Sequence, residues 1–154
     1  MYKLEKDNIP DGVRDDAIAL LKEFEGCKLT AYQCSAGVWT IGYGHTANVK
    51  KGDTISQKEA DAMLAADLVG YHNQLTSLVL APLYEGMHAA LISFIYNLGP
   101  NTCKTSSLFK HLNEGKYELA AECFPMYCNA GGKRLEGLVR RRRAEQKLFL
   151  RDMI

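Results

Sequence analysis

Glu25 stands where a helical pattern ends, directly before a glycine and a strand-rich segment. A carboxylate at such a junction can point into a cleft rather than into bulk solvent. Apolar neighbours such as Phe24, Tyr32 and Trp39 would disfavour its charged form by desolvation. A carboxyl group that keeps its proton near neutral pH can serve as a general acid. A lone glutamate at a helix end is more often a plain surface residue, so its neighbours decide between the two interpretations.

Cysteine is the other residue type with reactive chemistry, and the chain has five. An odd number cannot form a closed disulfide framework, so at least one thiol stays free or pairs between chains. Their spacing lacks the short pairs typical of zinc ligands, and we expect no metal and no organic cofactor. The five are Cys27, Cys34, Cys103, Cys123 and Cys128. The last three are expected to fill core space as small apolar side chains.

Apolar spacing predicts the elements that position these residues. A helix should begin after Asp11 and stop near Gly26, and the strand-favouring residues lie within 29–46. Ser56 and Glu59 form a capping-box pattern that starts a long helix toward Pro82. Further helices are expected over 87–98, after Ser106 or Ser107 to near Gly115, over 117–124, and from about Leu138, with a loop over 131–137.

These elements predict an α+β fold that is mostly α, with a small N-terminal antiparallel sheet and a helical C-terminal lobe. The chain has 154 residues, of which 47% are hydrophobic and 24% are charged. A chain of this length buries roughly two-thirds of its unfolded surface, so it can fold without disulfides or a structural metal. The composition excludes wholesale disorder, collagen and coiled coil.

The net charge of +1 hides an uneven distribution, because residues 131–154 carry 8 basic and only 3 acidic residues. We expect the arginines to cover the outside of the last helix, with Leu138, Leu148 and Phe149 facing inward. Such a surface fits an acidic partner, namely nucleic acid, anionic lipid or an acidic polysaccharide, or is simply a solvated helical face.

Nothing in the sequence predicts a membrane anchor. No window approaches the roughly 18 consecutive apolar residues of a membrane span, and residues 1–14 are too polar for a secretory signal. We therefore expect the chain to have no route of its own across a membrane.

Residues 25–46 read EGCKLTAYQCSAGVWTIGYGHT, and this segment closely resembles the phage-type lysozymes of glycoside hydrolase family 24, which are endolysins. Weaker collinear features are ISQKEADAMLAADL, SFIYNLG and GLVRRRRAE, so the resemblance covers nearly the whole chain after about residue 12. It implies one lysozyme-like, two-lobed domain over 1–154. The N-terminal lobe would span about 1–60, a connecting helix about 61–80, and the helical lobe about 81–154.

The resemblance also implies catalytic roles for single residues. Glu25 matches the general acid, which protonates the glycosidic oxygen between N-acetylmuramic acid and N-acetylglucosamine. Thr40 matches a threonine that helps to hold the attacking water. His45 matches a structural histidine, whose partner by register is Asp67 in an ion pair between a helix and the sheet.

Four further positions follow from the weaker part of the resemblance. Tyr96 and Ser107 fall at glycan-contacting positions. Asn97 occupies the position of an amide near the acid. Arg141 falls near an arginine that faces the acid.

Cys34 departs from the pattern, because most of the family has aspartate there as the second carboxylate. A thiol with an ordinary pKa of about 8.5 is mostly neutral at pH 7, and a nearby carboxylate would raise its pKa further. Some signal-anchor-release endolysins, a branch that this chain resembles without the anchor, use cysteine at this position. Three interpretations follow: a working Glu25–Cys34–Thr40 triad, a crippled or engineered enzyme, or a structural cysteine. The same branch implies that Cys27 can form a disulfide with Cys34 and block it.

The resemblance therefore predicts an enzyme that cleaves peptidoglycan for host lysis, by inversion at the anomeric carbon. A thiol nucleophile with retention is the second mechanism. We expect a monomer that binds no nucleic acid and stays in the host cytoplasm until the membrane is permeabilised. Two other classes stay open: a peptidoglycan amidase or peptidase that uses Cys34 with His45, and a noncatalytic basic module that binds wall polymer or nucleic acid.

Overall fold

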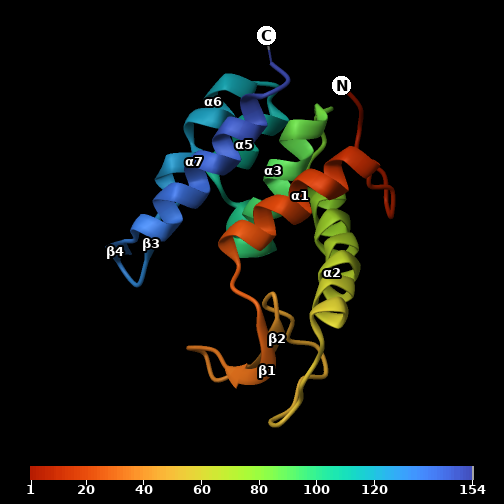
Figure 1. Cartoon of the computed structure of the whole chain (residues 1–154). Helices are drawn as coiled ribbons and strands as arrows, with labels where there is room; N and C mark the ends of the chain where they lie inside the picture. The colour runs from red at the N-terminus through yellow and green to blue at the C-terminus, as the bar shows by residue number, and fades with distance from the viewer. Residues whose placement is uncertain (154) are drawn as a thin grey trace.

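The computed structural model describes residues 1–153 and is mostly helical, as expected, with two small antiparallel sheets where one was expected. The sheet of β1 and β2 lies at one end of the molecule, α3 to α7 lie at the other, and α2 runs between them (Figure 1). The helices are α1 (Asp11–Phe24), α2 (Gln57–Leu78), α3 (Glu85–Leu98), α4 (Pro100–Lys104), α5 (Ser107–Asn113), α6 (Tyr117–Glu122), the 3-10 helix η1 (Phe124–Met126) and α7 (Glu136–Leu150). The strands are β1 (Lys28–Gln33), β2 (Trp39–Gly42), β3 (Asn129–Ala130) and β4 (Lys133–Arg134).

The long helix α2 begins at the predicted capping box. The Ser56 hydroxyl accepts a hydrogen bond from the Glu59 backbone N–H at 3.1 Å, and the Glu59 carboxylate accepts one from the Ser56 N–H at 3.4 Å. These two bonds satisfy amides that the first helical turn leaves without partners. At 1.5 Å per residue, the 22 residues of α2 span about 33 Å. This length lets one helix bridge the two ends of the molecule.

Helix α3 is the centre of the helical lobe, and ten consecutive residues of it, 86–95, are buried. It packs against α1, α2 and α7. Gly86 is needed at the contact with α7, because a Cβ there would lie 2.4 Å from the Leu148 carbonyl oxygen. A helix that is apolar all round is typical of such a central position.

Residues 1–60, which were expected to form one lobe, contribute to both ends of the molecule. The sheet lies at one end, and helix α1 lies at the other with the helical lobe (Figure 1). Its apolar face packs on α3. Asp11 is the first helical residue rather than the cap, since Pro10 holds the cap position. The helix ends at Phe24, and the backbone of Glu25 is extended, with φ −95° and ψ 123°. The chain then crosses to the sheet, so Glu25 stands at the junction.

The first sheet is a hairpin in which Tyr32 pairs with Thr40 and Gln33 with Trp39. Its turn is closed by hydrogen bonds from the Cys34 N–H to the Val38 carbonyl, at 3.0 Å, and from the Gly37 N–H to the Cys34 carbonyl, at 2.8 Å. Gly37 has a φ of +78°, a conformation that glycine adopts without strain. The hairpin therefore fixes Cys34 and Thr40 close together along the strands.

Two expectations for the C-terminal region are wrong. Residues 131–137 are not all loop, because β3 and β4 form a second hairpin around Gly131 and Gly132. Helix α7 buries part of its basic run instead of displaying it: Arg141 is 2% exposed and Arg142 is fully buried. Arg140 and Arg143 do face outward.

Of the apolar residues expected to face inward from α7, Phe149 is fully buried, whereas Leu138 and Leu148 are only half-buried. Polar side chains therefore fill part of the interface between α7 and α3, and their partners belong to the site described below. Among the described residues, no helix is long and apolar enough to cross a membrane.

The N-terminal segment is held by a buried chain of hydrogen bonds. The Tyr2 hydroxyl lies 2.7 Å from His88 Nδ1, His88 Nε2 lies 2.8 Å from His72 Nδ1, and His72 Nε2 lies 2.6 Å from the Glu5 carbonyl oxygen. With both imidazoles neutral, every nitrogen and the hydroxyl has a partner of the right kind. An added proton would break this alternation of donors and acceptors.

Acid should destabilise the fold through His88. Burial and the neighbouring His72 lower the pKa of His88 to about 3, whereas the unfolded value is about 6.5. Below pH about 6.5 the unfolded chain binds a proton that the folded chain does not, so the free energy of unfolding falls by up to about 1.4 kcal/mol per pH unit. Urea unfolding from pH 7 to 4.5 measures this slope. It should be shallower in His88→Gln than in the wild type; equal slopes in the two proteins would contradict the assignment.

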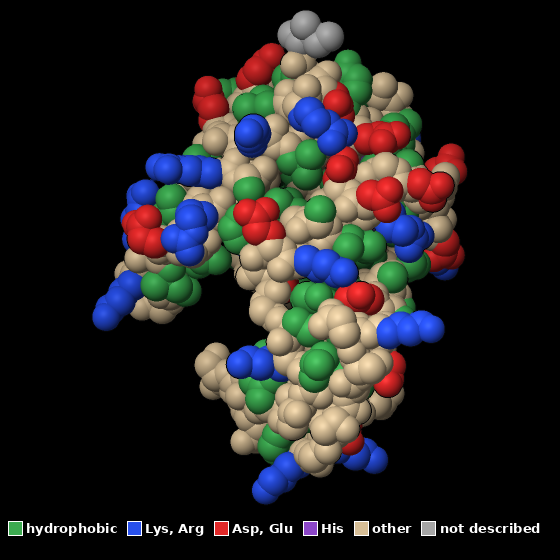
Figure 2. All heavy atoms as spheres, in the orientation of Figure 1, with side chains coloured by type: hydrophobic (Ala, Val, Ile, Leu, Met, Phe, Trp, Pro, Cys, Tyr) green, Lys and Arg blue, Asp and Glu red, His purple; other side chains and the backbone are tan. Residues whose placement is uncertain are grey.

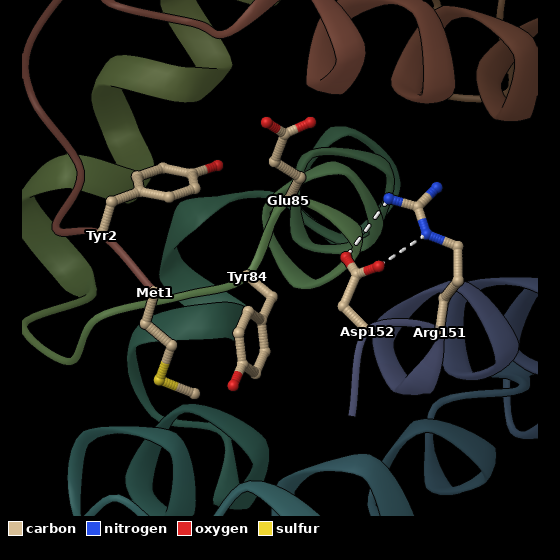
Figure 3. A pocket seen from close by; sticks show the side chains of 6 residues that line it. All are labelled: Met1, Tyr2, Tyr84, Glu85, Arg151 and Asp152. Atoms are coloured by element: carbon tan, nitrogen blue, oxygen red, sulfur yellow. Dashed lines mark hydrogen bonds and ion pairs between the residues drawn. The ribbon is translucent and has the colours of Figure 1, made fainter. Parts of the chain in front are cut away.

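A hollow of about 600 Å³ lies between the two chain ends and contains no residue of the predicted catalytic site (Figure 3). In it, Arg151 contacts Asp152 at 3.1 Å, and outside it Arg151 contacts Asp16 at 2.7 Å. The remaining lining residues are Met1, Tyr2, Tyr84 and Glu85. The Arg151–Asp16 pair ties the end of α7 to α1.

Candidate active site

The Glu25 carboxylate contacts the guanidinium of Arg141, with Oε1 and Nη1 2.6 Å apart. The two residues are 116 positions apart in the chain and meet because α7 packs near the end of α1. The Glu25 side chain is 23% exposed. The Arg141 contact is the one that the resemblance implies. Of the expected apolar walls, Phe24 lines the same hollow as Glu25, whereas Tyr32 is exposed.

Glu25 lines a hollow of about 420 Å³, and the space-filling view shows the surface hollowed between the helical lobe and the sheet (Figure 2). The lining residues are Glu23, Phe24, Glu25, Asn97, Leu135, Gly137, Leu138, Arg140 and Arg141. Gly44, just after β2, also approaches the acid, because a Cβ on it would lie 4.0 Å from Glu25 Oε2. The backbone φ of Gly44 is +90°, a conformation that favours glycine. A glycine here leaves open space in front of the carboxylate.

Cys34 and Thr40 lie on the hairpin, and their local geometry activates the thiol. Thr40 is 4% exposed, and its hydroxyl donates to the Val38 carbonyl at 2.9 Å. Backbone N–H groups of Val38 and Ala36, and then the Thr40 hydroxyl, hold the pKa of Cys34 below its ordinary value. The expected rise in this pKa is therefore wrong, because these hydrogen-bonding groups favour the thiolate.

Cys34 should be the first cysteine to react with an alkylating agent. The Cys34 thiol is half-exposed and its pKa is lowered, whereas burial raises the pKa of Cys103 to about 12. Limited iodoacetamide treatment of the folded protein at pH 7.5, followed by peptide mapping, should label Cys34 several-fold faster than Cys27. Preferential labelling of Cys103 would contradict this order.

All five cysteines are free thiols and lie within the described residues. Cys27 and Cys34 flank the six-residue strand β1, which at about 3.3 Å per residue keeps their Cα atoms at least about 15 Å apart. A disulfide needs a Cα separation under about 7 Å. The two cannot pair while β1 is formed, so the implied blocking disulfide requires this strand to rearrange. Cys103, Cys123 and Cys128 are buried, as expected.

His45 and Asp67 meet as predicted by register, with Nδ1 and Oδ2 2.8 Å apart. The other ring nitrogen, Nε2, lies 3.1 Å from the Ala47 carbonyl oxygen. Both nitrogens therefore lie against oxygen atoms of Asp67 and Ala47, and neither contacts Cys34. This geometry ties the loop after β2 to α2 and gives no support to a Cys34–His45 nucleophile and base.

The other predicted site residues divide into two groups. Tyr96 is near the acid, because its hydroxyl donates to the Tyr43 carbonyl and lies against Gly44. Asn97 lines the same hollow as Glu25. Ser107 instead contacts Tyr127, with hydroxyl oxygens 3.3 Å apart, and does not line that hollow.

Three residues in contact with this site were missed from the sequence: Ser93, Arg142 and Glu145. Glu145 is fully buried and accepts a hydrogen bond from the Ser93 hydroxyl at 2.6 Å. It also contacts Arg141 at 3.3 Å and Arg142 at 2.7 Å. The sequence signal for this cluster is the spacing of Glu145, which follows Arg141 by four residues and Arg142 by three. Residues at these spacings are neighbours on one face of a helix.

The chain is similar to known proteins over nearly its whole length. The family model described as Phage lysozyme matches residues 22–145. An endolysin of Acyrthosiphon pisum secondary endosymbiont phage 1 is 40% identical over 141 residues, 89% of this chain and 97% of that protein. A SAR-endolysin of Enterobacteria phage P21 is 33% identical over 127 residues, 82% of this chain and 77% of that protein.

A solved structure, the muramidase domain of SpmX from Asticaccaulis excentricus, has a TM-score of 0.83 and 32% identity. The superposition covers 97% of this chain and 99% of that domain. The expected lysozyme-like fold class is confirmed.

Proposed function

The chain belongs to the phage lysozyme family, and from this membership we infer that it is an endolysin, a lysozyme that hydrolyses bacterial peptidoglycan. We propose that the bond cleaved is the β-1,4 linkage between N-acetylmuramic acid and N-acetylglucosamine. The observation that carries this proposal is the placement of Glu25 at the end of α1, where the chain crosses to the sheet, in an open hollow that α1, α3 and α7 line. A glycan strand is a long, narrow substrate that fits such a cleft.

Glu25 is the general acid in this proposal. Arg141 fixes the orientation of the carboxyl group through one oxygen, so that the other is left toward the hollow. A sugar ring over the site excludes water, which favours the protonated form of the carboxyl group. The proton then passes to the glycosidic oxygen as the bond to the anomeric carbon breaks.

Cys34 and Thr40 position the water that attacks the opposite face of the sugar. The lowered pKa of Cys34 supports this role, because a thiolate can accept a hydrogen bond from water as the usual aspartate does. Attack by water from the face opposite the acid inverts the anomeric carbon. A thiolate that instead forms a covalent glycosyl intermediate, with retention, is the second mechanism.

The substrate suggests where the enzyme works. Peptidoglycan lies outside the bacterial membrane, and the endolysin acts on this wall. We propose that it accumulates in the host cytoplasm as a monomer and reaches the wall when the membrane is permeabilised. It binds no nucleic acid in this proposal, because the burial of Arg141 and Arg142 reduces the basic surface of α7.

Digestion of purified peptidoglycan tests the proposed bond. Mass spectrometry of the products should show new muramic-acid reducing ends and intact stem peptides. New amino or carboxyl groups on stem peptides would instead indicate an amidase or peptidase. Binding without products would indicate a noncatalytic module.

A further inference from the structure

We propose that Glu145 is a positioning residue for the catalytic acid: this buried carboxylate fixes Arg141 against Glu25 and, through Arg142, turns the Asn97 side chain toward the hollow. The inference rests on the proposed function, since it assigns a role to groups that surround the same acid. It starts from a side chain that touches neither solvent nor the cleft.

Glu145 first restricts Arg141. The Nε of Arg141 lies 3.3 Å from Glu145 Oε2, and its Nη2 donates to the Ser93 carbonyl at 3.0 Å. Two edges of the guanidinium plane are thereby held inside the protein. Nη1 remains, and it reaches Glu25 at 2.6 Å. The planar group cannot turn without breaking buried hydrogen bonds, so its position against the acid is fixed.

Arg142 extends the same control to Asn97. Its Nε lies 2.7 Å from Glu145 Oε1, and its guanidinium packs over the Phe94 ring with a separation of 5.0 Å. From this position Nη2 donates to Asn97 Oδ1 at 2.8 Å. Because the oxygen of the Asn97 amide is occupied, its NH₂ group is left as the donor on the wall of the hollow.

Charge balance couples this cluster to the state of the acid. Inside the protein, Arg141 and Arg142 contribute two positive charges and Glu145 only one negative charge. Glu25, which contacts Arg141, is the group that faces the remaining positive charge. Buried ion clusters of this kind often add little net stability compared with apolar packing, so stability alone is a weak reason to keep one. Orientation of two cleft groups by one carboxylate is the role that the geometry supports.

Glu145→Gln tests the inference, because it keeps the shape and removes the charge. Arg141 then faces Glu25 without the competing carboxylate, which favours the ionised form of Glu25. In the plot of kcat against pH, the alkaline limb should move to lower pH by about one unit. At pH values above the limb kcat should fall about tenfold or more, while KM changes less than about threefold.

Three further variants separate positioning from structure. Glu145→Asp keeps the charge, so its alkaline limb should stay in place while kcat falls. Ser93→Ala keeps all charges and removes the hydroxyl bonded to Glu145, and its kcat should fall about threefold. This variant replaces Glu145→Gln as the test if Glu145→Gln does not fold. Leu112→Ala, a buried core change away from the cluster, should lower the melting temperature and leave the limb and kcat unchanged.

A readout that does not depend on turnover completes the test. In ¹⁵N-arginine NMR spectra, two guanidinium groups of the wild type should show slow rotation, and Glu145→Gln should abolish it for one. An unchanged pH limb and kcat in folded Glu145→Gln, or wild-type kcat in Ser93→Ala, would overturn the inference while leaving the lysozyme proposal intact. A wild type that releases no muramic-acid ends would overturn the proposed function together with this inference.

Discussion

Glu25→Gln should reduce peptidoglycan turnover by at least about 1,000-fold, within the range of general acid catalysis. The amide keeps the size of the side chain and can still contact Arg141, but it has no proton to give to the leaving oxygen. Because Arg141 is buried and loses the charge of its partner, the melting temperature should fall, but the amide oxygen can still accept from Arg141 and the protein should stay folded. Reducing-end release and circular dichroism measure the two effects.

Asp15→Asn is the matched control, since it also removes one carboxylate, here from α1 at an exposed position away from the cleft. It should retain wild-type turnover. Substantial activity in folded Glu25→Gln would show that another group supplies the proton and would contradict the assignment of the acid.

Cys34→Asp should retain or raise the wild-type rate, whereas Cys34→Ala should lower kcat about tenfold to a hundredfold. Aspartate is ionised at neutral pH and accepts hydrogen bonds from water, and the N–H donors of the hairpin that lower the pKa of Cys34 would stabilise its charge. Alanine leaves nothing to hold the water beside Thr40. Initial rates on purified peptidoglycan give the comparison.

Cys27→Ser controls for the loss of a thiol, because Cys27 contacts only the Gln57 side chain among the described hydrogen bonds. Its activity under reducing conditions should match that of the wild type. Wild-type rates in Cys34→Ala would remove Cys34 from the mechanism and leave it a structural cysteine.

Short-range patterns predicted most of the scaffold. The capping box at Ser56 starts α2, and the end of α1 at Phe24 leaves Glu25 at the junction with the sheet. Both features depend on neighbours in the chain, so the sequence contains the information directly. Helix α4 was missed because Gly99–Pro100 ends α3, yet proline at the first position also begins a helix.

The buried part of the site could not be predicted in the same way. Arginine is ordinarily a surface residue, and the expectation for α7 followed that rule. Arg141 and Arg142 are buried because Glu145 neutralises them from the same helix and because Glu25 approaches from α1. The contact between Glu25 and Arg141 joins residues 116 positions apart. Periodicity within one helix does not reveal such a partner.

The origin of the oxygen in the products tests the central claim most directly. Peptidoglycan is digested in H₂¹⁸O, the products are reduced at once with borohydride, and the labelled atom is located by tandem mass spectrometry. If water attacks the glycosidic bond, ¹⁸O appears at the reduced muramic-acid end, and Glu25→Gln abolishes this labelling. Label in a stem-peptide carboxyl group, with no labelled muramic-acid end, would contradict the account.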